Sequence, residues 1–260
     1  MATPFFGKLT LIRVSGFQKT YHDFTAVHGL DFEVAPGQIL GLVGPNGAGK
    51  TTTMRAIVGI IPPTAGTIEV AGYDVVRRPT HAKRALAYVP DDPKLFDALT
   101  VWEHIEFVAS AYRVRGWQAR AEELVERFEL THKRNTLAQE LSRGMRQKVA
   151  ICCAYMHEPK AVLLDEPHTG LDPRGIRTMK DSVQQYAEGG AAVVISSHLL
   201  RLVEDLCTHL LILHQGQRLF FGPETEARAA FADLDADASL EEVFFRATEG
   251  QRAAPNGTGA

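Results

Sequence analysis

The chain has 260 residues, 45% of them hydrophobic, which suffices for one large α/β domain or two smaller ones with a true core. Its net charge of −3 and pI near 6.4 argue against nucleic acid as the main partner, because nucleic-acid-binding domains are usually basic. No signal peptide is evident and no apolar run is long enough to span a bilayer, so any membrane function needs a separate chain that spans it.

The first 75 residues combine strand-like segments with the start of a nucleotide-binding core. Leu9 to Phe17 and Leu30 to Val34 have short β-like patterns, and Gly16 is expected to break the first of them. Thr67 to Gly72 alternates between apolar and polar residues, as a strand does. We therefore expect antiparallel strands here.

Residues 44–51 read Gly-Pro-Asn-Gly-Ala-Gly-Lys-Thr and match the G-x-x-x-x-G-K-[ST] phosphate-binding loop. An apolar strand-like run at 38–43 precedes it, and residues 52–61 follow with helical spacing. In this context backbone N–H groups and the helix dipole converge on phosphate, Lys50 reaches the β- and γ-phosphates, and the Thr51 hydroxyl ligates Mg²⁺. The residues expected to bind nucleotide are Gly44, Pro45, Asn46, Gly47, Ala48, Gly49, Lys50, Thr51 and Thr52.

Residues from about 95 to 157 are expected to be helical, with Gly116 breaking a first helix and a second one running from Trp117 to Phe128. Before them, Thr80 is expected to cap a short helix that ends near Ala85. Thr100 to Glu103 has the pattern of a capping box, and Ser142 is expected to cap an amphipathic helix that runs to Met156.

The three cysteines lack metal or redox spacing, which fits a reducing, cytoplasmic setting.

After residue 160 helical and strand-like segments alternate, which predicts a parallel sheet with helices on its faces. Ligands gather at the carboxyl ends of such strands, so Asp165, Glu166 and His198 are expected to face the phosphate loop. Asp165 is expected to hold Mg²⁺, and Glu166 to orient and deprotonate the attacking water as general base. His198 is expected to contact the γ-phosphate.

Residues 141–147 read Leu-Ser-Arg-Gly-Met-Arg-Gln. With the phosphate loop and the segment Leu163 to Pro167, they resemble the signature of ATP-binding cassette (ABC) ATPases, whose pattern is L-S-G-G-x-x-Q. The resemblance extends from about Leu9 to Gly250. It implies an α/β fold with a RecA-like phosphate-loop NTPase core, an antiparallel β subdomain and an inserted α-helical signature subdomain.

The implied organisation is a single ABC ATPase domain over residues 1–250. About 1–75 form the antiparallel β subdomain with the phosphate loop, about 91–158 the helical subdomain, 159–222 the core and 223–250 the C-terminal helices, with a flexible tail at 251–260. The ending Ser239 to Thr248 includes a second capping box. It resembles the ending of drug, lipid and polysaccharide exporter cassettes whose membrane domain is a separate protein.

The resemblance also implies a mechanism in which two copies pair head to tail around two ATP molecules with Mg²⁺. Tyr21 would stack on adenine, while Ser142 and Gly144 would face the γ-phosphate held by the other copy. Asp172 lies in the segment that the family calls the D-loop. Hydrolysis would open the pair and drive alternating access in an integral membrane permease on a separate chain, at the inner face of the cell membrane.

Two residues depart from the family pattern. Arg143 replaces the first signature glycine, which exporter cassettes tolerate. Asp91 stands where the family usually has glutamine, so it adds a negative charge and loses an amide donor. We expect Asp91 to remain a catalytic residue and metal ligand with altered coupling, and the change Asp91→Gln to leave ATP binding intact.

Two other readings compete with the exporter subunit. A soluble ABC ATPase acting as an assembly or regulatory module is the first, although the 115 residues between Lys50 and Asp165 (165 minus 50) leave no room for the long coiled coil of chromosome or repair types. A subunit that binds nucleotide without hydrolysing it is the second. The presence of Lys50, Asp165, Glu166 and His198 argues against it.

Overall fold

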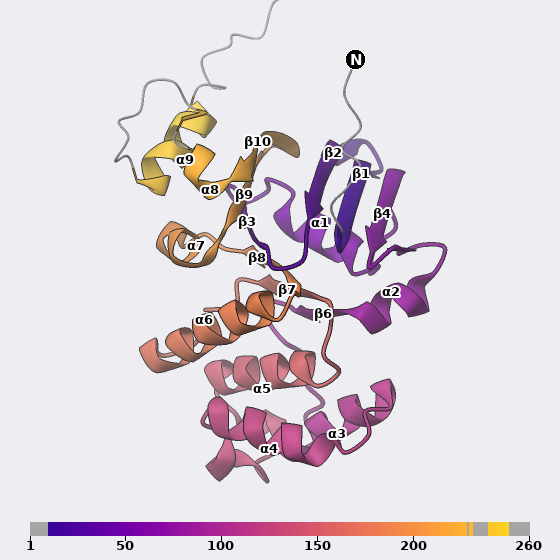
Figure 1. The fold of residues 1–260 in the computed structure, drawn as a ribbon, viewed down its shortest axis with the longest axis vertical. Helices are drawn as coiled ribbons and strands as arrows, with labels where there is room; N and C mark the ends of the chain where they lie inside the picture. The colour runs from indigo at the N-terminus through magenta and orange to yellow at the C-terminus, as the bar shows by residue number, and fades with distance from the viewer. Residues whose placement is uncertain (1–9, 228, 231–238, 250–260) are drawn as a thin grey trace, which may run out of the picture.

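The computed structural model describes residues 10–227, 229–230 and 239–249, and its centre is a six-stranded sheet (Figure 1). Five neighbouring strands are parallel and the edge strand β10 is antiparallel to β9. This is the parallel sheet that the alternating sequence pattern predicts. In spatial order the strands are β10 (Gln217–Pro223), β9 (His209–His214), β3 (Ile39–Val43), β8 (Ala192–Ser196), β7 (Ala161–Asp165) and β6 (Leu86–Val89).

A second, antiparallel sheet is built from the N-terminal region, in the order β2 (Phe24–Val34), β1 (Ile12–Tyr21), β4 (Ala65–Val70) and β5 (Tyr73–Asp74). The first two strands are longer than predicted, and the expected break at Gly16 is wrong. Pairing continues past Gly16 through register shifts, because Gly16 takes a φ of 59° and its N–H donates to Asp31 Oδ1 at 2.7 Å. Leu9, the expected start of the first strand, lies outside the described residues.

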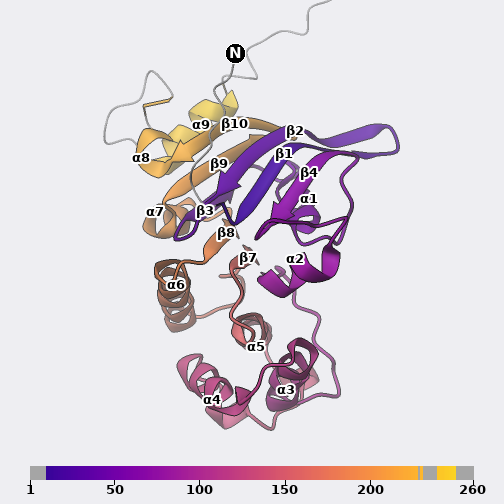
Figure 2. The same cartoon turned by 45° about the vertical axis from the view of Figure 1, so that its right-hand side comes forward.

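Both faces of the six-stranded sheet are covered (Figure 2). Val162 and Leu164 of β7 pack in one apolar cluster with residues of α5 (Arg143–Tyr155), α6 (Pro173–Glu188) and α7 (Leu200–Leu206). Ala161 and Leu163 pack in another with residues of α1 (Lys50–Ile57) and of the antiparallel sheet. Burial on both faces explains why β7 is a continuous apolar run rather than an alternating one.

The helices between β6 and β7 form an arm at the end of the molecule opposite the antiparallel sheet (Figure 1). They are α3 (Val101–Tyr112), α4 (Trp117–Arg127), the short 3₁₀ helices Thr131–Lys133 and Ala138–Glu140, and α5. The predicted break at Gly116 and the second helix from Trp117 are confirmed, because Gly116 is the N-cap of α4. Helix over the rest of 95–157 is too broad an expectation, since turns separate the elements and α3 already ends before Arg113, which has a φ of 58°. The capping box is confirmed: Thr100 Oγ1 accepts from Glu103 N, and Glu103 Oε2 accepts from Thr100 N.

Two further predictions concern helix starts. The prediction that Thr80 caps α2 (Pro79–Ala85) is wrong, because the helix begins at Pro79 and Arg78 holds the cap position. Proline favours the first helical position, since its φ is already helical and its missing N–H is not needed there. The capping box before α9 (Leu240–Glu249) is confirmed by reciprocal Ser239 and Glu242 hydrogen bonds.

A short helix, α8 (Glu224–Ala227), follows β10. Residues 231–238 of the expected C-terminal helical segment, and the expected tail at 251–260, lie outside the described residues. Within the described ranges, no helix is long and apolar enough to cross a bilayer.

Candidate nucleotide site

The phosphate loop joins β3 to α1 and depends on its glycines. Gly47 and Gly49 have φ of 81° and 101°, in the left-handed region that side chains other than glycine rarely adopt. A Cβ at Gly44 would lie 2.4 Å from the carbonyl oxygen of Leu213 on the neighbouring strand. The loop therefore holds this path only with glycine at these three positions.

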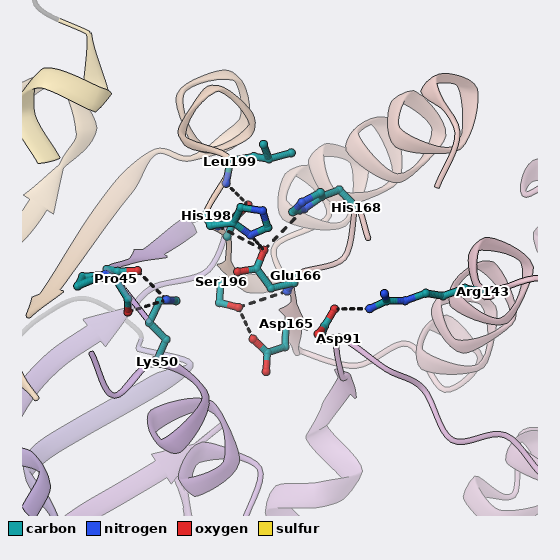
Figure 3. Close-up of polar contacts among 12 residues, drawn as sticks. Pro45, Lys50, Asp91, Arg143, Asp165, Glu166, His168, Ser196, His198 and Leu199 are labelled. Atoms are coloured by element: carbon teal, nitrogen blue, oxygen red, sulfur yellow. Dashed lines mark hydrogen bonds and ion pairs between the residues drawn. The ribbon is translucent and has the colours of Figure 1, made fainter. Parts of the chain in front are cut away.

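Lys50 is the first residue of α1, and its side chain folds over the loop (Figure 3). The Nζ atom donates to the carbonyl oxygens of Gly44 and Pro45, at 2.6 and 3.2 Å. Burial lowers the pKa of Lys50, while the carboxylates of Glu166 and Asp165 act in the opposite direction. The ammonium is thus held between the loop and two acidic residues.

An open cleft of about 1380 Å³ lies above the loop. It gathers residues from β1, the phosphate loop, and the segments that follow β6, β7 and β8, as expected for the carboxyl ends of parallel strands. The predicted site residues that line it are Tyr21, Asn46, Gly47, Ala48, Gly49, Lys50, Thr51, Thr52, Asp91, Asp165, Glu166 and His198.

Asp165 ends β7 and is only 4% exposed. The Ser196 hydroxyl, at the end of the neighbouring β8, donates to Asp165 Oδ1, and Tyr88 OH of β6 donates to Oδ2 at 3.3 Å. Burial, followed by the nearby Asp165 carboxylate, raises the pKa of Tyr88. Sequence reasoning missed Tyr88, although its place near the end of a strand beside β7 could have indicated it.

Glu166 follows Asp165 with a φ of 48°, an uncommon value for a residue other than glycine. Its Oε2 atom lies 2.8 Å from His198 Nδ1 and also accepts from the His198 backbone N–H at 3.3 Å. Left-handed backbone conformations of this kind concentrate at functional sites. The turn directs the carboxylate toward the end of β8 rather than along the strand.

The two residues that depart from the family pattern meet in space. Arg143 Nη2 lies 3.1 Å from Asp91 Oδ1, and both side chains are about half exposed, at 49% each. The segment after β6 is therefore linked to the first turn of α5 (Figure 3). The Asp91 carboxylate is directed at Arg143 rather than at Asp165.

Five predicted residues, all within the described ranges, do not line the cleft. Gly44 and Pro45 belong to the phosphate loop itself, whereas Ser142, Gly144 and Asp172 come from other segments. Ser142 Oγ accepts from Met145 N at 3.2 Å at the start of α5, as predicted, and Asp172 Oδ1 accepts from Gly175 N at 2.8 Å at the start of α6. A Cβ on Gly144 would lie 2.1 Å from the Gly170 carbonyl oxygen. The starts of α5 and α6 thus share one tightly packed surface.

One edge of the cleft is aromatic. Tyr21 is 42% exposed, and Lys19 Nζ lies 5.0 Å from its ring centre. Phe24, which sequence reasoning missed, lines the same edge and is 66% exposed. A second aromatic residue three positions after Tyr21 was the available signal in the sequence.

The fold and the cleft define a phosphate-loop nucleoside triphosphatase, with the strand-end acid Asp165 beside the loop and a second acid, Glu166, next to it in the cleft. Comparison with known proteins identifies the family of this nucleoside triphosphatase. Residues 27–169 match the family model described as ABC transporter, so the chain belongs to the ATP-binding cassette family, whose members are ATPases coupled to transport.

Two relatives and one solved structure illustrate the similarity. The chain is 33% identical to the ABC-type transporter ATP-binding protein EcsA of Bacillus subtilis, over 93% of this chain and 98% of EcsA. It is 34% identical to the lipopolysaccharide export system ATP-binding protein LptB of Escherichia coli, over 84% and 92% of the two chains. A structure described as the ATP binding subunit of an ABC transporter superposes with a TM-score of 0.88 at 32% identity, covering 92% and 99%.

Proposed function

We propose that this chain powers export of a substrate through a separate integral membrane permease, and that two copies pair head to tail around two ATP molecules. The observation that carries the proposal is the division of the site residues. Twelve predicted residues line one cleft, while Ser142, Gly144 and Asp172, at the starts of α5 and α6, do not line it. A second copy would bring the starts of its α5 and α6 to the γ-phosphate.

Mg²⁺ fits the residues of this cleft. The Thr51 hydroxyl and the Asp165 carboxylate offer oxygen donors, which Mg²⁺ prefers. When bound, Mg²⁺ would neutralise charge on the β- and γ-phosphates. Asp91, also expected to be a ligand, would first have to leave its ion pair with Arg143.

The roles of the chain's own residues follow from their positions. Lys50 would exchange its contacts with the Gly44 and Pro45 carbonyls for phosphate oxygens. Glu166 would accept a proton from the attacking water, and His198 would move from Glu166 toward the γ-phosphate. Tyr21 and Phe24 offer aromatic faces on which adenine could stack.

In the pair, Ser142 would present its hydroxyl and the start of α5 to the γ-phosphate bound by the other copy.

We assign about residues 1–75 to the antiparallel subdomain with the phosphate loop, 91–158 to the helical subdomain, 159–222 to the core and 223–250 to the C-terminal helices. The whole would work on the cytoplasmic face of the cell membrane. The export direction is supported by the ending Ser239 to Thr248 and by the similarity to LptB.

Mixing two inactive variants tests the head-to-tail pair. Lys50→Ala inactivates the phosphate-loop contribution to each site, and Ser142→Ala inactivates the signature contribution. Each variant alone should therefore hydrolyse little ATP. A mixed pair contains one doubly damaged site and one intact site, so an equal mixture should regain about a quarter of the wild-type sites. A mixture no more active than its components would reject the pairing.

Purification from membranes tests the partner. The full chain should co-purify with a multi-span membrane protein in detergent, and ATP should change the stability of that complex. Recovery of the active ATPase only as a membrane-free particle would favour an assembly or regulatory module instead.

A further inference from the structure

Two imidazoles face the Glu166 carboxylate from different segments of the chain (Figure 3). His168 comes from the turn after β7 and His198 from the turn after β8. Glu166 Oε2 lies 2.8 Å from His198 Nδ1 and 3.9 Å from His168 Nδ1. One ligand atom from each of the three side chains lies within 4.8 Å of the other two.

His168 has no part in the nucleotide site described above, yet its side chain is only 9% exposed. Its Nδ1 atom is buried and has no hydrogen-bond partner, since 3.9 Å to Glu166 exceeds hydrogen-bonding distance. Leaving a buried nitrogen without a partner costs free energy. A ligand at Glu166 would give this nitrogen a partner.

We propose that Glu166, His168 and His198 bind Zn²⁺ or another late first-row divalent cation, and that this cation stops ATP hydrolysis. The binding part stands on the three side chains alone. The inhibitory part rests on the proposed function, because it takes Glu166 to be the general base.

The donor set selects the class of metal. Two imidazoles and one carboxylate suit zinc, cobalt and iron(II), and three protein ligands leave a further position open. Ligand atoms around a tetrahedral zinc lie about 3.3 Å apart, and the 2.8 and 3.9 Å separations lie on either side of that value. Mg²⁺ would instead choose the all-oxygen donors at Thr51 and Asp165.

Other zinc ligands of the chain compete poorly. In the described part of the chain, no other group of three histidine, cysteine or acidic side chains is close enough to share an ion. Burial raises the pKa of the Cys153 thiol to about 12, so it stays protonated and is a weak ligand. The site should therefore take one zinc ion per chain.

Occupation would remove two groups from hydrolysis at once. Zinc bound to the Glu166 carboxylate would withdraw negative charge and lower its basicity, so the carboxylate would accept a proton from water poorly. His198, held by the same ion, could not reach the γ-phosphate. The ion would thus be an inhibitor that competes for the base rather than for the phosphate loop.

Calorimetric titration of the full, tag-free chain with Zn²⁺ in the absence of nucleotide tests binding. We expect one Zn²⁺ per chain, and at least about 10-fold weaker binding in His168→Asn, since even the hydrogen-bond partners of metal ligands change affinity by about 10- to 100-fold. His132→Asn, on an exposed residue of the helical arm, is the matched control and should bind like wild type. Equal binding by wild type and His168→Asn would overturn the site.

A second variant guards against misfolding of His168→Asn. His198 is 65% exposed, so His198→Asn should fold normally. Co²⁺ should give the visible absorption bands of a four-coordinate site with wild type and lose them with His198→Asn. Bands that persist in this variant would also overturn the site.

An ATPase assay then distinguishes zinc binding at the three residues from inhibition of hydrolysis by the bound zinc. Zn²⁺ added to saturating Mg²⁺ and ATP should inhibit wild type, and His168→Asn should need at least about 10-fold more Zn²⁺ for the same fractional inhibition. Zinc that binds at the three residues without slowing hydrolysis would refute the inhibition and the proposed base role of Glu166, while the binding site would stand.

Discussion

The phosphate-loop side and the signature side of this chain differ in how they are built. The first is a cleft with buried charges, including Lys50 at 9% exposure and Asp165 at 4%. The second is the start of α5, where the exposed Ser142 caps the helix and the backbone of the buried Gly144 touches that of Gly170. Under the proposed function, the first side would carry out chemistry on a bound triphosphate and the second would contact another copy of the chain.

Because of this difference, substitutions on the two sides should impair different properties of the protein. Changes in the cleft should affect binding or chemistry within one chain. Changes on the signature surface should affect packing and the step that needs a second chain.

The largest effect is expected for Glu166→Gln. Because glutamine cannot accept the proton, turnover should fall by about 100- to 10,000-fold, while ATP binding persists and the pair accumulates. Phosphate release measures turnover, a fluorescent nucleotide measures ATP binding, and light scattering measures the amount of the pair. Glu188→Gln, exposed at the end of α6, is the control. Undiminished turnover would remove Glu166 from the chemistry.

Lys50→Ala should weaken nucleotide binding itself by about 10- to 100-fold, because it removes a charge-assisted contact with phosphate. Lys94→Ala is matched to it, since Lys94 also lines the cleft but is 85% exposed and pairs with Asp92. Equilibrium binding of a fluorescent ATP analogue compares the two. Similar losses in both variants would indicate general attraction by positive charge instead of a specific phosphate contact.

Gly144→Ala tests the signature surface. The new Cβ would lie 2.1 Å from the Gly170 carbonyl oxygen, so backbone must shift and the free energy of unfolding should fall by about 1–3 kcal/mol. Gly189→Ala, where a Cβ meets only ordinary contacts at 3.4 Å, should change it by less than about 0.5 kcal/mol. Urea unfolding measures both, and an unchanged stability for Gly144→Ala would contradict the close contact.

The smallest effect is expected where the two sides connect. The Asp91–Arg143 ion pair is half exposed, so a double-mutant cycle with Asp91→Gln and Arg143→Gly should give about 0.2–1 kcal/mol of coupling. Asp91→Gln should leave ATP binding intact while it changes the dependence of turnover on the permease. Loss of ATP binding in this variant would show that Asp91 belongs to the binding machinery.

Local patterns predicted much of this molecule. The phosphate loop, the buried strand before Asp165 and the caps at Thr100, Ser142 and Ser239 are each encoded within a few neighbouring residues. These could be read because hydrogen bonding and burial there depend on short spacings.

Contacts between distant residues could not be predicted in the same way. Tyr88 and Asp165 are 77 positions apart, and Arg143 and Asp91 are 52 apart, so only the fold brings them together. The strand that continues past Gly16 depends on the bond to Asp31 across the sheet, and His168 had no motif to indicate it. Tertiary geometry, rather than any propensity of these residues, decides each case.

The contact between Gly144 and Gly170 also has a mechanical consequence. With no side chain between the two backbones, nothing soft can absorb a displacement of one against the other. The first turn of α5 and the segment before α6 should therefore move as one stiff piece. A displacement of either segment should therefore displace Ser142 by nearly the same amount.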